Sequence, residues 1–252
     1  MTTPKAMILA AGLGTRLRPL TTDRPKALVE IAGRTLLEIT LVRLRSFGVT
    51  DVIVNVHHFA DQVVDYLRAK SHFGMRIEVS REDELLDTGG GLKKAAWFFQ
   101  EDTANRNAPF LLHNVDVLSN IDLTRMLARH AESHALATLA VQDRPTSRYL
   151  LFDDRHQLCG RRAGRDGAPE LVCSCPSTRA FAFSGIHVIS PSLFPMLTEE
   201  GAFSIVTSYL RLAAQAETIQ AFPADEYYWR DLGRPENIAQ AAQDVANKIV
   251  RI

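Results

Sequence analysis

The sequence predicts an α/β fold in which a mostly parallel sheet is flanked by helices and followed by a smaller β-rich part. From residue 5 to residue 135, short apolar segments alternate with segments of helical periodicity, an order typical of parallel sheets covered on both faces. Residues 6–11 are continuously apolar, as in a strand buried on both faces. Beyond residue 135 the segments become short and strand-like, without clear helices between them.

In the first part of the chain, strands and helices are expected to alternate regularly. Leu37, Leu41 and Leu44 recur at helical spacing, and Asp122 stands where an N-cap residue is expected. The pattern predicts strands at residues 5–11, 49–59, 75–82 and 109–118, and helices at residues 35–48, 60–74, 90–101 and 122–135.

The second part is expected to be richer in strands. The pattern predicts strands at residues 136–143, 149–154, 157–162 and 180–189, helices at residues 190–199 and 204–216, a strand pair within residues 219–233 and a closing helix over residues 234–252. The polar stretch of residues 160–178 is predicted to form a mobile surface loop or a lid.

Composition narrows the class of protein. The 252 residues suit one large α/β domain or two small ones, and 29 basic residues balance 29 acidic residues. A general nucleic-acid binder usually has a basic excess, so no nucleic-acid partner is expected. No apolar stretch approaches the roughly 20 residues of a membrane helix, so no membrane partner is expected. We expect no signal peptide, and three cysteines favour a reducing, cytoplasmic setting.

The most informative stretch follows the first predicted strand. Gly12 and Gly14 allow a tight turn whose N–H groups face a ligand, and Thr15 and Arg16 add a hydroxyl and a planar guanidinium that fits phosphate. Further along, Lys26 is a point charge presented by the preceding proline. Together these residues predict a triphosphate-binding loop.

Two common nucleotide-binding motifs do not fit this loop. The dinucleotide fingerprint needs a third small residue near Leu17, and an NAD-dependent oxidoreductase would have an acidic residue where this chain has His57 and His58. A P-loop needs a Gly-Lys-Ser/Thr sequence, but Lys26 comes twelve residues after Gly14.

Five segments in order resemble the sugar-1-phosphate nucleotidyltransferases, also called NDP-sugar pyrophosphorylases. "LAAGLGTRLRPLTTDRPKAL" (residues 9–28) resembles the signature loop of this family, and "EDELLDTGGGLKKA" (82–95) resembles its second nucleotide-contacting segment. "LLHNVDVL" (111–118) and "YYWRDLGRPENI" (227–238) are similar to the segments that carry metal-binding aspartates. "FSGIHVISP" (183–191) resembles the sugar-contacting strand.

The resemblance implies a Rossmann-like fold of the nucleotide-diphospho-sugar transferase type, with one domain over residues 1–252. Residues 1–134 would form a nucleotide-binding half, and residues 135–252 would form a sugar-binding half with a small β-rich subregion and the closing helix. The family joins a sugar 1-phosphate to an NTP and releases pyrophosphate, so both substrates are expected partners. Because the attacking oxygen and the triphosphate are anionic, the protein has to screen charge and align the attack.

The resemblance also implies roles for individual residues on the nucleotide side. The base and ribose would meet the backbone of Ala10, Ala11 and Gly12. The β- and γ-phosphates would meet Gly14, Thr15 and Arg16, with Arg16 stabilising the leaving group. Lys26 would bridge the α-phosphate and the sugar phosphate, so Arg16, Lys26 and Asp116 are the expected catalytic residues. The wall beside the nucleoside would be Thr88, Gly89 and Gly90, where a missing side chain permits close approach.

On the metal and sugar side, the resemblance implies a second set of residues. Asp116 and Asp231 would hold Mg²⁺, which prefers oxygen ligands and often takes one or two protein carboxylates. The sugar would meet Asn114, Ser184 and Gly185. Asn114 is two residues before Asp116 and would face the same side of its strand.

Residues 160–179 depart from the family pattern. Many relatives have a Glu-Lys-Pro sequence here whose lysine contacts the sugar phosphate, and this chain has none. The sequence leaves open whether another cation replaces it; the candidates are Arg161, Arg162, Arg165 and Arg179. A zinc site is a weaker interpretation than ordinary reduced thiols for the loosely spaced His156, Cys159, Cys173 and Cys175.

The sequence says least about which nucleotide base and which sugar the substrates carry. "DTGGG" (87–91) and "NVHHFADQV" (55–63) favour the short bacterial family members that use UTP and N-acetylmuramate 1-phosphate. Guanylyl transfer to mannose 1-phosphate remains an alternative, as does a nucleotide-sugar sensor without catalysis. Homo-oligomerisation is also left open.

Overall fold

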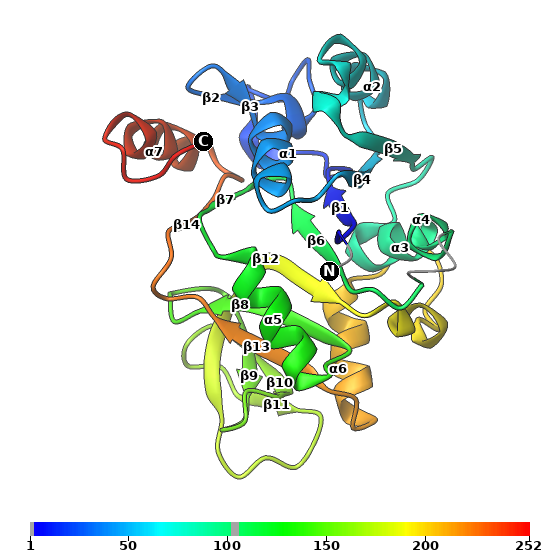
Figure 1. The fold of residues 1–252 in the computed structure, drawn as a ribbon. Helices are drawn as coiled ribbons and strands as arrows, with labels where there is room; N and C mark the ends of the chain where they lie inside the picture. The colour runs from blue at the N-terminus through cyan, green and yellow to red at the C-terminus, as the bar shows by residue number, and fades with distance from the viewer. Residues whose placement is uncertain (1–2, 102–105) are drawn as a thin grey trace.

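One mixed sheet runs through the molecule (Figure 1). The computed structural model describes residues 3–101 and 106–252. Neighbouring strands of the sheet follow the order β11-β10-β9-β12-β6-β1-β4-β5. The parallel part consists of β1 (Ala6–Leu9), β4 (Asp51–Val56), β5 (Arg76–Arg81) and β6 (Phe110–Asn114). It matches the first three predicted strands and the beginning of the fourth.

The β-rich part continues the same sheet. Its long strand β12 (Arg179–Ile189) runs antiparallel to β6 and also pairs with the strands beyond it. The other strands of this part are β8 (Ala137–Gln142), β9 (Arg148–Phe152), β10 (Leu158–Ala163), β11 (Pro169–Leu171) and β13 (Ile219–Pro223). The two halves therefore share a continuous hydrogen-bonded backbone.

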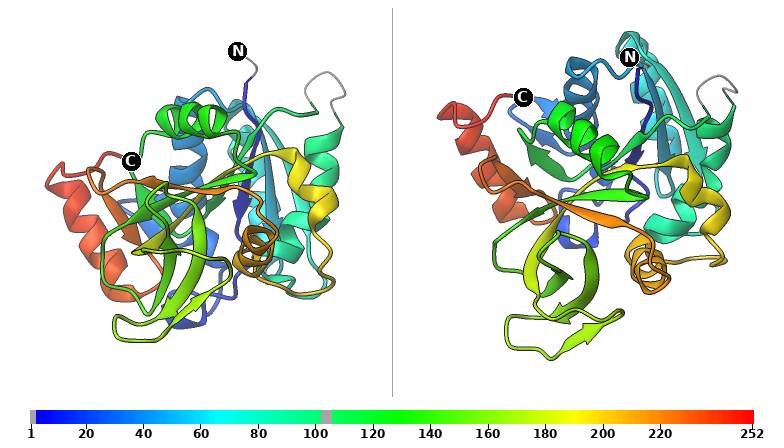
Figure 2. Two further views of the ribbon diagram at one scale, coloured as in Figure 1. Left: turned by 90° about the horizontal axis from the view of Figure 1, so that it is seen from below. Right: turned by 60° about the horizontal axis from the view of Figure 1, so that its bottom comes forward.

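Helices cover both faces of the sheet, which confirms the predicted layers (Figures 1 and 2). One core cluster contains Ile8 of β1 and apolar residues of α1 (Leu36–Ser46), α2 (Ala60–Ala69), α5 (Leu123–Ser133) and α7 (Pro235–Ala246). The next β1 residue toward the N-terminus, Met7, joins the opposite cluster with α3 (Asp87–Lys94), α4 (Ala96–Gln100), η4 (Pro191–Met196) and α6 (Ile205–Ala214). A strand buried on both faces explains the continuously apolar first segment.

Local sequence accounts for several helix boundaries. The side chain of Asp122 accepts hydrogen bonds from the N–H groups of Thr124 and Arg125, which confirms the expected N-cap of α5. The expected helix over residues 90–101 begins earlier, at Asp87, and is interrupted at Ala95 between α3 and α4. The expected helix over residues 190–199 is only the short 3₁₀ helix η4, which contains a proline.

Two predicted strand segments are divided because each serves two parts of the fold. Residues 109–118 form β6 and then β7 (Val117–Ser119), with Asp116 at the break. Residues 219–233 do not form a strand pair with each other. Instead β13 runs parallel to β8, while β14 (Trp229–Asp231) runs antiparallel to β7. Tertiary pairing, which local periodicity does not encode, decides both outcomes.

The stretch predicted as a loop over residues 160–178 is partly ordered as a hairpin. β10 and β11 pair in it, with Arg161 opposite Glu170. The side chains of these two residues form an ion pair with an N–O distance of 2.7 Å.

The remaining short elements lie near the N-terminal signature loop and after α2. They are η1 (Thr15–Leu17), η2 (Lys26–Leu28), β2 (Glu30–Ile31), β3 (Arg34–Thr35) and η3 (Ser71–Gly74). Within the described ranges, every helix is too short or too polar to cross a membrane.

Candidate active site

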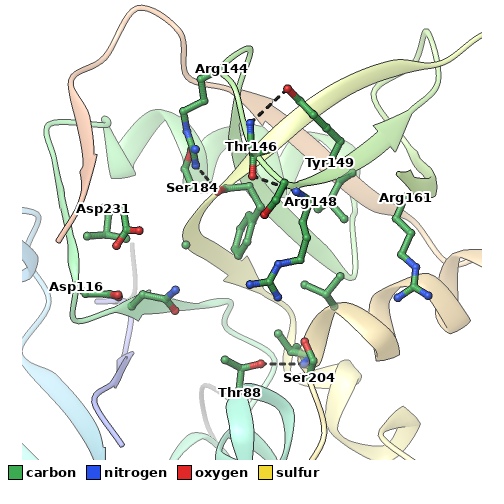
Figure 3. Close-up of a pocket in the computed structure, with 18 of the residues that line it drawn as sticks. Thr88, Asp116, Arg144, Thr146, Arg148, Tyr149, Arg161, Ser184, Ser204 and Asp231 are labelled. Atoms are coloured by element: carbon green, nitrogen blue, oxygen red, sulfur yellow. Dashed lines mark hydrogen bonds between the residues drawn. The ribbon is translucent and has the colours of Figure 1, made fainter. Parts of the chain in front are cut away.

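A cavity of about 1160 Å³ opens where the two halves of the sheet meet (Figure 3). Its lining comes from the β6–β7 turn, the first part of α3, strands β9, β10 and β12, the start of α6 and β14. Residues from both halves of the chain therefore face one space. Of the residues predicted for the site, the lining includes Arg16, Thr88, Asn114, Asp116, Ser184, Gly185 and Asp231.

Asp116 and Asp231 are far apart in sequence but line the same part of the cavity (Figure 3). The pairing of β7 with β14 places Asp231 opposite Val117, and the N–H of Leu232 donates to the carbonyl of Asp116 at 2.8 Å. Asp231 accepts a hydrogen bond from the N–H of Gly233 through Oδ1 at 2.7 Å, and Asp116 forms an ion pair with Lys26. Backbone pairing thus holds the two carboxylates side by side.

This pair of carboxylates has the donor chemistry that Mg²⁺ requires. Both supply hard oxygen ligands and both line an open cavity with room for water and phosphate oxygens. No group of three or more His, Cys, Asp or Glu side chains that could hold a metal is found in residues 3–101 and 106–252. Magnesium sites often have only one or two protein carboxylates, and the other ligands come from substrate and water.

The N-terminal signature loop brings two of the predicted cations to this centre. Gly14 has a φ of 64°, and a Cβ placed on it would lie 3.2 Å from the Cβ of Lys26. The hydroxyl of Thr21 donates to the carbonyl of Gly14 at 2.8 Å and closes the loop. A Cβ on Gly233 would lie 3.2 Å from Nη2 of Arg16, so the Arg16 guanidinium lies against the turn that follows Asp231.

The first residues of the loop lie outside the cavity lining. Ala10 and Ala11 are buried, whereas Gly12 and Thr15 are exposed. A Cβ on Gly12 would meet no atom within 4 Å, so its backbone is open to a ligand. The nucleotide roles predicted for these residues remain predictions.

A buried polar bridge that the sequence analysis did not single out braces this loop. The amide of Asn55, at the end of β4, accepts from the N–H of Ala10 at 2.7 Å and donates to Oε1 of Glu82 at 2.7 Å. Glu82 also accepts from the N–H of Leu86 at 3.0 Å. Asn55 and Glu82 are 2% and 4% exposed. The bridge joins two segments that carry the family resemblance, although neither residue forms a recognisable local motif.

Gly89 and Gly90 are required by close packing within the chain. A Cβ on Gly89 would lie 2.3 Å from the ring of Phe203, and one on Gly90 would lie 2.4 Å from the carbonyl oxygen of Gly201. The space on the Cβ side of these glycines is therefore filled by residues 201–203, and their predicted contact with the nucleoside remains a prediction. Thr88 does face the cavity, and its hydroxyl accepts from the N–H of Ile205 at 3.0 Å.

The three predicted sugar residues lie together at the β6–β12 contact. The register of β12 shifts between Phe183 and His187, and Gly185 there has a φ of 74°. A Cβ on Gly185 would lie 2.9 Å from Nδ2 of Asn114. Ser184 is fully buried and lines the cavity, and its hydroxyl has no partner among the described residues.

Several arginines line the cavity, and only some of them were predicted from the sequence. Of the four arginines proposed to replace the missing lysine, Arg161 and Arg162 line the cavity, whereas Arg165 and Arg179 do not. The sequence analysis missed Arg144, Arg148, Tyr149, Trp229 and the start of α6. The "PTSRY" stretch (residues 145–149), which leads into β9, has the proline and hydroxyl residues of a turn, but no local pattern identifies it as a cavity wall.

The cysteines lie apart from the cavity lining. Cys159 is buried, Cys173 is exposed and all three thiols are free. Burial raises the pKa of the Cys159 thiol, and the neighbouring Cys175 acts in the same direction. The raised pKa favours the neutral thiol form of the buried Cys159.

Comparison with known proteins supports the family and the fold. The nucleotidyl transferase family profile matches residues 5–153. The chain is 34% identical over 244 residues to N-acetylmuramate alpha-1-phosphate uridylyltransferase of Caulobacter vibrioides, covering 92% of each protein. It is 37% identical to UTP–glucose-1-phosphate uridylyltransferase of a Synechocystis strain, over 98% of this chain and 64% of the relative.

More distant similarities point the same way. The chain is 29% identical to mannose-1-phosphate guanyltransferase of Candida albicans, over 92% of this chain and 62% of the relative. The solved inositol-1-phosphate CTP transferase of T. maritima superposes with a TM-score of 0.74 at 15% identity, covering 97% of this chain and 95% of that one, which supports the fold. The chain therefore belongs to the nucleotidyl transferase family, and its identification as an enzyme of the sugar-1-phosphate nucleotidyltransferase type is confirmed.

Proposed function

We propose that this enzyme transfers the uridylyl group of UTP to N-acetylmuramate 1-phosphate in a Mg²⁺-dependent reaction. The observation that carries the proposal is the convergence of Asp116, Asp231 and Arg16 with the sugar-side residues Asn114 and Ser184 on one cavity. The Caulobacter vibrioides relative supports the choice of substrates, because it matches this chain over almost its whole length.

The residues of the site divide the electrostatic work of an in-line attack on the α-phosphorus. Lys26 lies against Asp116 and can exchange this carboxylate for the phosphate oxygens that both substrates bring. Arg16, beside the Asp231–Gly233 turn, would neutralise charge on the departing pyrophosphate. No covalent intermediate is required, because aligning two anions and screening their repulsion is sufficient.

Mg²⁺ would be held by the carboxylates of Asp116 and Asp231, and when bound it would supply positive charge to phosphate oxygens. The protein contributes the fixed spacing of the two carboxylates through the β7–β14 pairing. The N–H of Gly233 also holds Oδ1 of Asp231 in place. Ser184 and Asn114 would orient the sugar, since both reach the cavity from the β6–β12 contact.

Guanylyl transfer to mannose 1-phosphate is the second candidate. The Candida albicans relative favours it, although it is less similar and this chain spans less of its length. A catalytically silent nucleotide-sugar sensor would not require the paired Asp116 and Asp231 beside Lys26 and Arg16, so their presence argues for catalysis.

Pyrophosphate release in the presence of Mg²⁺ tests the proposal directly. The four common NTPs and dTTP are each paired with N-acetylmuramate, mannose and glucose 1-phosphates. We expect turnover with UTP and N-acetylmuramate 1-phosphate that disappears with EDTA. Greater turnover with GTP and mannose 1-phosphate would establish the second candidate. Binding of NTP without turnover of any pair would establish the sensor.

A further inference from the structure

Arg144 is fixed in an unusual position on the wall of the cavity. Its guanidinium carbon lies 3.6 Å from the centre of the Trp229 ring, and its Nη2 donates to the carbonyl of Phe183 at 2.7 Å. The ring is itself fixed, because Nε1 of Trp229 donates to the carbonyl of Ser184 at 2.7 Å. The planar cation is thus held against the β12 segment that contains the predicted sugar residues.

Part of this guanidinium remains unused within the protein. Nε of Arg144 has no hydrogen-bond partner among the described residues, but protein encloses it, so a ligand can meet only the Nη atoms. Burial lowers the pKa of Arg144, while the charge of Asp231 opposes this effect, which places the cation within electrostatic reach of that carboxylate. A desolvated cation with free donor capacity binds an anion more strongly than an exposed one does.

Two other arginines of the lining already have acidic partners. Arg161 is paired with Glu170, and Arg230 is paired with Asp244 at 2.8 Å. Figure 3 shows Arg144 above Ser184 on the side of the cavity that holds Asp231, whereas Arg161 lies on the far side. Arg16 and Lys26 reach the centre from the nucleotide half, so the sugar half has to supply a cation of its own.

We propose that Arg144, held over the ring of Trp229, binds the phosphate of the sugar 1-phosphate and orients it for attack. This inference rests on the proposed function. The phosphate oxygens would take the open donors of the guanidinium, while the Phe183 and Ser184 carbonyls keep the Arg144–Trp229 pair in place. The arrangement assigns a substrate contact to a residue that lies outside residues 160–179, where the sequence analysis placed its candidates.

Steady-state kinetics of Arg144→Gln test the inference. We expect the KM for the sugar 1-phosphate to rise about 10- to 100-fold, as for loss of a hydrogen-bonded charge, with the KM for the NTP unchanged. Arg144→Lys should show a smaller rise, because an ammonium group keeps the charge but not the planar fork. Arg179→Gln is the matched control: Arg179 also lies over an aromatic ring, at 5.2 Å from that of Phe181, but does not line the cavity.

The outcomes separate this inference from the proposed function. A folded Arg144→Gln enzyme with an unchanged KM for the sugar 1-phosphate, or with equal rises in both KM values, would overturn the inference alone. Wild-type enzyme that turns over no sugar 1-phosphate would overturn both. Calorimetric binding of NTP and thermal unfolding report whether Arg144→Gln is folded; if it is not, the KM shift of Arg144→Lys decides the question.

Discussion

The half of the chain proposed to bind the nucleotide and the half proposed to bind the sugar build their shares of the cavity in different ways. In the nucleotide half, a single loop after β1 brings Arg16 and Lys26, ten residues apart, to the centre. In the sugar half, the wall is assembled from several separate segments, among them those of Arg144, Arg161, Ser184 and Trp229. The first share is local in sequence and the second is an outcome of strand pairing.

The difference follows from the two kinds of sheet. Parallel strands end on the same edge, so the loop after one strand lies beside the loops after its neighbours. Antiparallel strands such as β9, β10 and β12 present side chains from along their length. The loop proposed to bind the triphosphate can therefore be encoded by a contiguous motif, whereas the surface proposed to bind the sugar depends on strand register.

The largest expected effect comes from the two carboxylates, one from each half. Asp116→Asn and Asp231→Asn should each lower kcat by about 10²- to 10³-fold, because each removes a charge aimed at the reacting phosphates. Titration of activity with Mg²⁺ measures the effect, and Asp65→Asn, on the exposed face of α2, is the control. Loss in only one of the two variants would show that one half alone holds the metal.

Lys26 tests the nucleotide half by itself. Lys26→Gln should lower kcat/KM about 10- to 100-fold, since a charge-assisted contact to phosphate is lost and Asp116 is left without its ion partner. Lys94→Gln, at the exposed end of α3, should be unaffected. Equal rates of pyrophosphate release from wild type and Lys26→Gln would contradict the bridging role.

Substitution of Gly90 and of Gly12 separates a glycine required by packing from a glycine whose Cβ side is open. Gly90→Ala should lower the free energy of unfolding by about 1–3 kcal/mol, since overpacking forces a shift. The added Cβ would lie 2.4 Å from the carbonyl oxygen of Gly201. Gly12→Ala should leave the unfolding midpoint unchanged, because nothing lies within 4 Å of its Cβ. Denaturant titration of both variants makes the comparison, and equal stability of the two would refute the packing explanation.

The smallest expected effect is a loss of folding stability at acidic pH, caused by two buried histidines on the strands that join the two halves. Burial lowers the pKa of His113 on β6, and likewise that of His187 on β12, from 6.5 to about 3. A folded state that excludes these protons is fully stabilised above pH 6.5 and loses stability as the pH falls toward 3, because the unfolded chain binds them first. Thermal unfolding between pH 7 and 4 should show a falling midpoint. His187→Gln should make the unfolding midpoint depend less on pH. If the dependence on pH is unchanged, groups other than His187 cause it.

Some interpretations needed only local sequence. The continuously apolar residues 6–11, the glycines that follow them and the order of motifs from Gly12 to Lys26 identified the family and the parallel half of the sheet. Asp116 and Asp231 were also predicted as site residues from the sequence, because each lies in a segment that resembles a motif of the family. These features are encoded within windows of a few residues, where side-chain type and spacing decide the structure.

Tertiary structure alone decided how those pieces meet. Only strand pairing shows that β14 joins β7 and brings Asp231 to Asp116, and that residues 160–178 contain a hairpin. Only packing shows that Gly89 and Gly90 make room for residues 201–203 and that Arg144 lies on Trp229. The sequence by itself determined the chemistry that the enzyme contains, and the structure decided its placement, because contacts between distant segments depend on register and burial that no local pattern specifies.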